Sequence, residues 1–502
     1  MKTVRGPRIE AAVLLVAAQR QTTATACSGI ILQRPQTTSA RRHIHASQRQ
    51  IHTSQPKEQD AILRSPSASA VPPAPTPEAS AQSGVAAMSA LDCLPLQQIL
   101  RTYLITSVSS SPQLLAASTA ILRRMLESKS LLFSIERNPL ARALLWHTFY
   151  RQFCAGETRE QVQKVSDDLR RQGYSGVILE YALEVLKDAE GTDESVDIQT
   201  WRTGMLKSVS MAAEGDFVGL KWSGMGPAAM KRMKKCEPPS KEMDEAMNAV
   251  CKAAAAGDIS LLPAAEETWS LDGFHKWSLD LQRVYNLGSK SVVYNTYQVY
   301  LKQTPATLSQ HLAMAKADGF TFGAKLVRGA YLGSEERSVI CPSIEATHAA
   351  YDGIASALIH REHNEIIRPL AGGASWPSTN IVLATHNAIS VSRAQELRRQ
   401  QAARGEELTH LSFAQLQGMA DEVSCTLLAA AKASEAEASE GGMKVVKEKV
   451  FKCTTWGSMY ECLNYLLRRA AENKDAAGRT IETRRAMGAE LGRRMRGVVG
   501  LA

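Results

Sequence analysis

The stretches FGAKLVRG at 322–329 and NIVLATH at 380–386 give the clearest indication of the fold, because each is a short apolar run that ends in polar residues. A segment long enough for a helix separates them. Short buried strands that alternate with longer helices are typical of repeated βα units and a parallel sheet. The same alternation continues along the chain from Gly173 onward.

Six further runs bring the candidate strands to eight. They are GVILEY at 176–181, FVGLKW at 217–222, ISLLPA at 259–264, SVVYNTY at 291–297, HLSFAQL at 410–416 and VVKEKVFKC at 445–453. Eight strands with intervening helices predict an α/β fold, a (β/α)₈ TIM-like barrel over residues 173–502. The runs at 259 and 410 are the weaker signals, so a doubly wound open sheet is the alternative. No GxGxxG or GxxxxGK sequence follows a strand, so the usual dinucleotide and P-loop fingerprints are missing.

The segment before the barrel divides into three parts. Residues 91–172 have mostly helical apolar spacing, with a break expected near Asn138 and Pro139, and form a helical N-terminal section. Residues 58–90 contain SPSASAVPPAPTPEASAQSG at 65–84, which is too rich in Pro, Ala and Ser to bury a core. We therefore expect a disordered linker there.

Residues 1–57 carry most of the net charge of the chain. They contain nine Lys or Arg and one acid, Glu10, whereas the whole chain of 502 residues has a net charge of +9. An Arg-rich, acid-poor N-terminus predicts a mitochondrial transit peptide. The apolar run AAVLLVAA at 11–18 leaves a secretory signal as the alternative, although eight residues cannot span a bilayer.

This uneven charge argues against a nucleic-acid binder, which needs Lys and Arg spread over a folded face. The nine cysteines form no CxxC pair and no cluster with histidine at zinc spacing. The sequence therefore indicates neither a disulfide framework nor a metal site.

Chemistry in such a barrel belongs at the carboxyl ends of the strands. Polar residues follow several candidate strands and deserve attention for that reason: Lys221, Arg328, Tyr331, His386, Asn387 and Gln415.

The segment SMYECLNYLLRRAAEN at 458–473 follows the last strand. At helical spacing Arg468 and Glu472 share a face, while Arg469 points about 100° away. A solvated ion pair explains these residues without any function. The alternative is that two guanidinium groups clamp a carboxylate and Glu472 faces an ammonium group or holds an arginine in place. An amino acid offers both groups.

Three motifs in order, KLVRGAY at 325–331, ATHNA at 384–388 and RRAAEN at 468–473, closely resemble the proline dehydrogenase family. The resemblance extends from about Leu131 to Arg485 and is nearest to the short, monofunctional mitochondrial members of fungi and animals. It implies a barrel that holds non-covalent FAD, hydride transfer from the ring carbon of proline, and Δ¹-pyrroline-5-carboxylate as the product. Electrons would then pass to a quinone at the inner membrane, with the enzyme in the matrix or in peripheral contact with the matrix face.

The resemblance also implies residue roles. Substrate-binding roles fall on Arg468, Arg469, Glu472, Lys221, Tyr331 and Leu416. Flavin-binding roles fall on Lys325, Arg328, Gly329, Ala330, Thr385, His386 and Asn387, and more weakly on Gln415 and Asn295. A cation at Lys325 would stabilise negative charge that develops on the flavin ring.

Two positions depart from the family pattern. The usual Asp-Ala-Glu triplet after the third strand reads Ala264, Ala265, Glu266. Glu266 faces the opposite side from position 265 by strand alternation, and we do not assign it the lost role. Cys453 stands where the family presents a tyrosine to the substrate ring, so 4-hydroxyproline becomes an alternative substrate. Cys453 also suits an ordinary buried position. Because of Ala264, a catalytically silent paralogue that binds an amino acid or flavin as a sensor is a third hypothesis.

Overall fold

The computed structural model describes residues 89–128, 130, 134–135, 137–182, 193–370, 375–440, 446–472 and 477–499. The predicted transit peptide and nearly all of the predicted linker lie outside these residues.

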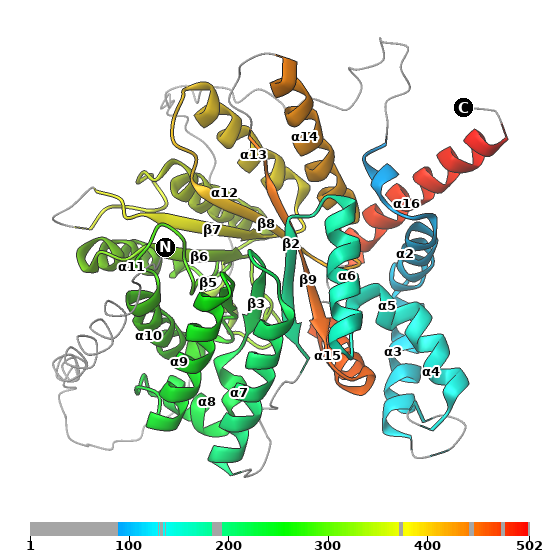
Figure 1. Cartoon of the computed structure of the whole chain (residues 1–502), viewed down its shortest axis with the longest axis horizontal. Helices are drawn as coiled ribbons and strands as arrows, with labels where there is room; N and C mark the ends of the chain where they lie inside the picture. Colours follow the sequence, from blue (N-terminus) through cyan, green and yellow to red (C-terminus); the bar gives the residue numbers. More distant parts are fainter. Residues whose placement is uncertain are drawn as a thin grey trace, which may run out of the picture. The chain divides into compact units, whose positions relative to one another are not determined.

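Eight parallel strands form a nearly closed barrel with helices around it (Figure 1). The strands are β2 (Gly176–Tyr181), β3 (Phe217–Leu220), β4 (Ser260–Pro263), β5 (Asn295–Gln298), β6 (Phe322–Val327), β7 (Thr379–Ala384), β8 (His410–Leu416) and β9 (Lys449–Trp456). They are paired in the order β4-β3-β2-β9-β8-β7-β6-β5. Between β4 and β5 the ring continues through a parallel bridge of Leu261 with Val293. This ring confirms the predicted barrel and excludes the open sheet.

Helices connect the barrel strands. They are α7 (Glu194–Met211), α8 (Pro227–Lys234), α9 (Lys241–Ala256), α10 (Thr268–Tyr285), α11 (Thr304–Asp318), α12 (Ile344–His360), α13 (Ala388–Ala403) and α14 (Asp421–Glu440). Two short 3₁₀ turns, η3 (Trp222–Met225) and η4 (Arg337–Val339), follow β3 and β6. After β9 come α15 (Met459–Glu472) and α16 (Ala477–Val498). Side chains such as Ser240 and Ser343 cap helix starts by accepting a backbone N–H.

The section before β2 is mainly helical, as predicted. It contains η1 (Ala90–Cys93), α2 (Leu96–Ser109), α3 (Pro112–Glu127), α4 (Pro139–Leu145), the π-helical turn η2 (Trp146–Tyr150), α5 (Arg151–Phe153) and α6 (Arg159–Gln172). Asn138 caps α4, where the break was expected. The three-residue strand β1 (Cys154–Gly156), which pairs with β9, was not predicted. Helix α2 packs against α16 near the end of the chain, where Arg484 donates to Ser110.

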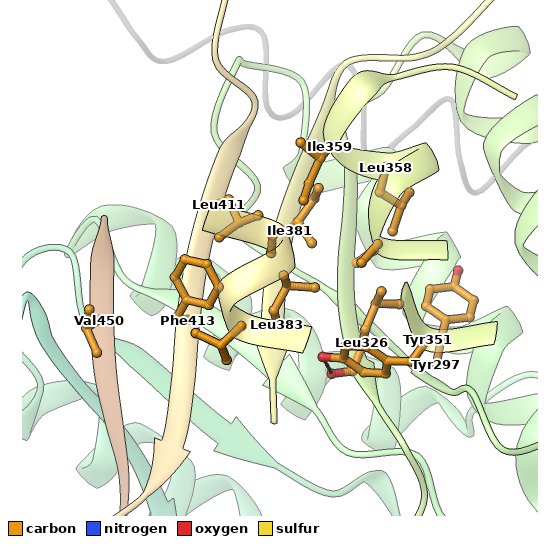
Figure 2. Packing of buried hydrophobic residues seen from close by; sticks show 14 of the residues in the cluster. Tyr297, Leu326, Tyr351, Leu358, Ile359, Ile381, Leu383, Leu411, Phe413 and Val450 are labelled. Carbon is orange, nitrogen blue, oxygen red and sulfur yellow. Dashed lines mark hydrogen bonds between the residues drawn. The ribbon is translucent and has the colours of Figure 1, made fainter. Parts of the chain in front are cut away.

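Alternate residues of each strand face the two sides of the barrel wall. Figure 2 shows outward residues of β6, β7 and β8, among them Leu326, Leu383 and Phe413, packed with Leu358 and Ile359 of α12. Burial of each such side chain contributes about 1.5–3 kcal/mol. A separate inner cluster fills the barrel: Ile178, Phe217, Leu262, Tyr294, Val382, Ala414 and Phe451.

Candidate active site

The carboxyl ends of β3, β6, β7, β8 and β9 gather most of the predicted site residues at one end of the barrel. We call this end the carboxyl mouth and define it by Lys221, Arg328, Thr385, Leu416 and Cys453. Because parallel strands end together, residues distant in sequence meet there.

Arg328 is the most constrained cation of the carboxyl mouth. Its Nε donates to Nδ1 of His348 at 3.1 Å, Nη1 to Oγ1 of Thr385 at 2.6 Å, and Nη2 to Oγ of Ser390 at 2.8 Å. The guanidinium group also lies 4.2 Å from the ring centre of Tyr351. Contacts from α12, the end of β7 and α13 thus fix both the position and the plane of this group.

The partners of Arg328 are themselves held. Ser390 donates to Oδ1 of Asp352 on α12, and Asp352 also pairs with Arg393. Burial lowers the pKa of His348, and the positive charge of Arg328 lowers it further. A neutral His348 keeps Nδ1 available as the acceptor for Arg328. The sequence did not predict His348, Asp352 or Ser390, because these three residues lie on helices.

Gly329 brings the backbone close to an aromatic ring directly after Arg328. Its φ of 138° is strained for residues with a side chain, and a Cβ atom would lie 2.3 Å from the Tyr300 ring. Ala330 and Tyr331 follow in the same loop. The loop is tied to the start of α10, where the carboxylate of Glu335 accepts from the N–H and hydroxyl of Thr268, both at 2.6 Å.

The turn after β7 is locked to β8. Thr385 accepts from the N–H of Asn387, and Asn387 caps α13 by accepting from the N–H of Ser390. His386 accepts at Nε2 from the N–H of Leu416, at 3.1 Å. Gln415 donates to the carbonyl of Thr385 at 3.2 Å, so Gln415 supports this turn from outside the barrel wall.

Lys221 retains a carboxylate neighbour despite Ala264. Its Nζ lies 3.8 Å from Oε1 of Glu266, and both side chains are about one quarter exposed. The sequence assigned no role to Glu266, which follows the end of β4 at Pro263 and places its carboxylate near Lys221. A carboxylate therefore stands beside Lys221 at the mouth.

Cys453 lines the inner side of β9 as a partly buried neighbour of the inner cluster. Burial raises the pKa of its thiol well above the usual value, and Glu180 adds to this effect while Lys325 opposes it. The thiol is therefore protonated at neutral pH. Glu180 of β2, which sequence reasoning missed, accepts from the hydroxyl of Tyr465 on α15 at 3.0 Å.

The contact between Tyr465 and Glu180 holds α15 at the mouth. Arg469 lies over the Tyr465 ring, with the guanidinium carbon 5.4 Å from the ring centre, and Arg468 is half-buried on the same helix. Glu472 is the last residue of α15, and its side chain lies outside what the structure describes. The structure thus brings the paired arginines to a helix docked on the mouth.

The structure does not bring Asn295 to the mouth. It is fully buried on the outer side of β5, where its Oδ1 lies 3.0 Å from Nδ1 of His275 on α10. Gln298 shares the inner face with Tyr294 and donates to the carbonyl of Glu266 at 2.7 Å. Because every second residue of a strand faces the same side, Gln298 faces inward as Tyr294 does.

A buried ion pair holds the loop after β8. Nζ of Lys452 contacts Oδ1 of Asp421 at 2.7 Å and the carbonyl of Met419 at 3.0 Å, and both charged side chains are at most 2% exposed. The pair fixes the loop that follows Leu416.

Within the described ranges, no cluster of His, Cys, Asp and Glu suits a metal ion. Among the helices of that same part of the chain, none has the length and apolar character to cross a bilayer.

The chain is similar in sequence to a known family over most of the barrel. The sequence model of the family described as "Proline dehydrogenase" matches residues 162–482. A protein of Schizosaccharomyces pombe named "Probable proline dehydrogenase, mitochondrial" is 26% identical over 408 residues, which cover 69% of this chain and 78% of the relative. Human "Proline dehydrogenase 1, mitochondrial" is 31% identical over 263 residues, which cover 51% of this chain and 39% of the relative.

A solved structure shares the fold. It is proline utilization A from Bdellovibrio bacteriovorus, inactivated by N-propargylglycine, with a TM-score of 0.53 and 15% identity. The superposition covers 73% of this chain and 37% of that chain.

Proposed function

Because this chain belongs to the proline dehydrogenase family, we propose that it oxidises L-proline to Δ¹-pyrroline-5-carboxylate with FAD and passes the electrons to a quinone. The observation that carries the proposal is the meeting of the KLVRGAY and ATHNA segments through Arg328 and Thr385, 2.6 Å apart, at the mouth on which α15 docks.

The chemistry of the carboxyl mouth fits FAD. Arg328 offers a fixed cation, Gly329 allows close approach of the backbone, and the start of α13 at Asn387 presents backbone N–H groups. Cations and helix starts favour phosphate and a reduced, negatively charged ring. We assign Lys325, Arg328, Gly329, Ala330, Thr385, His386 and Asn387 to FAD, with Gln415 as a support.

Bound at this mouth, FAD supplies the hydride acceptor. Arg468 and Arg469 hold the substrate carboxylate and thereby orient the ring. The carboxylates of Glu180 and Glu266 favour the positive amine of the substrate, and Lys221 keeps Glu266 in place. Leu416 and Tyr331 form apolar walls that exclude water from the reacting carbon. We place Glu472 beside the arginines.

The full-length chain, purified and loaded with FAD, tests the proposal. We expect a bound-flavin absorbance spectrum that bleaches when L-proline is added without oxygen, and turnover with a quinone analogue. A protein that takes up no flavin, or bound flavin that proline leaves oxidised, would overturn it. Turnover would also exclude the silent paralogue.

A second candidate substrate is 4-hydroxyproline, which Cys453 favours. The protonated thiol is smaller than the tyrosine of the family pattern and leaves room beside the ring. Anaerobic bleaching by proline and by hydroxyproline compares the two directly. Under this alternative, Cys453→Tyr shifts the ratio of the two rates toward proline, and an unchanged ratio argues against it.

We further propose that the protein acts in mitochondria, in the matrix or at the matrix face of the inner membrane. The Arg-rich N-terminus and the names of its relatives support this location. A fluorescent fusion of the full chain should colocalise with mitochondria, whereas the same fusion without residues 1–57 should not.

A further inference from the structure

A second cavity, of about 350 Å³, lies at the opposite end of the barrel, where the strands begin. Its walls include Phe217 of β3, Ser260 of β4, Ser412 of β8 and Phe451 of β9. We call it the amino-end cavity. None of the residues predicted for the active site lines it.

The lining of the amino-end cavity carries charge of one sign. Lys290, Arg398, His410, Lys447 and Lys449 line it, and none of the lining residues is Asp or Glu. Burial lowers the pKa of His410, and Lys449, Arg398 and Lys290 lower it further, while Glu407 acts in the opposite direction. The positive field of the cavity therefore acts on a group at its rim.

Most of these cations have an acidic partner outside the cavity. Lys290 pairs with Asp258 at 2.6 Å and Lys447 pairs with Glu435 at 2.6 Å. Lys449 has no carboxylate partner among the residues that the structure describes. One positive charge at the cavity thus remains unbalanced within this part of the chain.

Two further residues of the lining, Arg398 and Ser412, have polar groups that can donate hydrogen bonds. Arg398 is 5% exposed; its Nε donates to Glu448 at 2.8 Å and its Nη1 to the carbonyl of Thr409 at 2.7 Å. Nη2 is the guanidinium nitrogen left for the cavity. Ser412 is 8% exposed, and its hydroxyl makes no hydrogen bond within the described ranges.

We propose that the amino-end cavity binds a small phosphate or phosphate monoester, held by Arg398, Ser412 and Lys449. The three donors come from α13, β8 and β9, and all three residues line the cavity. A tetrahedral phosphate offers separate oxygens to each of them, whereas a carboxylate has only two oxygens. The site is independent of proline oxidation, because no residue of the carboxyl mouth takes part.

Calorimetric titration of the full-length, FAD-loaded protein with inorganic phosphate tests the site, with chloride at equal ionic strength as the reference. A parallel titration with glycerol phosphate shows whether the site binds a phosphate monoester or the free ion more tightly. We expect saturable binding that weakens about tenfold or more in Lys449→Ala, as the loss of a charge-assisted hydrogen bond predicts.

Ser412→Ala should weaken binding less, and Lys241→Ala, at a side chain 93% exposed on α9, should leave it unchanged. The flavin spectrum serves as a folding check in every variant. The site is rejected if neither phosphate gives saturable binding above chloride, or if Lys449→Ala and Lys241→Ala bind phosphate equally well.

Discussion

Each end of the barrel contains one buried ion pair, and β9 or the residue before it supplies one partner of each. At the carboxyl mouth, Lys452 pairs with Asp421 and also donates a hydrogen bond to the carbonyl of Met419 in the loop. At the amino end, Glu448 pairs with Arg398, which also holds the carbonyl of Thr409. In the first pair, Nζ of Lys452 donates to groups of the protein. In the second pair, Nη2 of Arg398 is left for the amino-end cavity. The same kind of pair therefore fixes a loop at one end and retains a donor for a ligand at the other.

The two ends also differ in charge balance. The carboxyl mouth mixes signs, with Lys221 beside Glu266, and with Glu180 and Lys325 both acting on the pKa of Cys453. The lining of the amino-end cavity contains cations alone. Mixed charge suits a zwitterion such as an amino acid, and a single sign suits an anion. Substitutions at each end of the barrel test this contrast.

Lys452→Met should have the largest effect. Without its partner, Asp421 is a buried and uncompensated charge, so we expect a loss of about 3–5 kcal/mol in the free energy of unfolding. Urea unfolding followed by tryptophan fluorescence measures it. Lys241→Met, at an exposed pair, is the control and should keep the wild-type midpoint. A Lys452→Met protein as stable as the control would contradict a structural role for the pair.

Arg398→Met should destabilise the protein by about 3 kcal/mol, and the loss should depend on pH. Burial already raises the pKa of Glu448, and Arg398 is the main charge that opposes this. In the variant, the native state takes up a proton at a pH where the unfolded chain does not, so stability recovers as the pH falls through the raised pKa toward the ordinary value. Unfolding at several pH values checks this. Arg399→Met, at an exposed neighbour, should show neither effect, and a loss independent of pH would exclude Glu448 as its cause.

Arg468→Met should reduce substrate binding by about 1.5–3 kcal/mol through the loss of a charge-assisted hydrogen bond, with FAD retained. Steady-state kinetics with proline and a flavin spectrum report the two parts separately. Arg399→Met again serves as the matched control. Unchanged KM and kcat in Arg468→Met would remove the carboxylate clamp from the proposed mechanism.

Ser390→Ala should have the smallest effect, about 1 kcal/mol or about fivefold in the Kd for FAD. The hydroxyl links Arg328 to Asp352, and Ser390→Thr, which keeps a hydroxyl, should restore the affinity. Flavin fluorescence during titration measures the Kd. Equal affinity in the two variants would mean that Ser390 does not aim Arg328.

Much of the barrel can be predicted because each buried strand corresponds to a local run of apolar residues in the sequence. The run at 410–416 coincides with β8. The run at 291–297 is less accurate, since β5 is assigned only from Asn295 and its earlier part takes part through a single bridge at Val293. The strand β1 is too short, at three residues, to give a periodic signal.

Site residues can be predicted from the sequence only where they belong to a recognisable motif. Arg328 and Thr385 come from strand ends and were identified, but His348, Asp352 and Ser390 lie on helix faces whose direction depends on packing. Glu266 received no role from the sequence, because its contact with Lys221 lies beyond the end of β4 and depends on how the following loop folds. Asn295, a weaker flavin candidate from the sequence, lies on the outer side of β5, since its neighbour Tyr294 faces inward.

The pairing of β2 with β9 has a consequence for folding while the protein is being synthesised. The strands β2 and β9 pair through residues such as Gly176 and Phe451, which are 275 positions apart. A ribosome makes the chain from its N-terminus, so β2 waits for its second neighbour until nearly all later strands have emerged. During that time the sheet presents an unpaired edge, which is a template for aggregation. Chaperone demand during synthesis should therefore end when β9 leaves the exit tunnel, and not gradually as each strand is added.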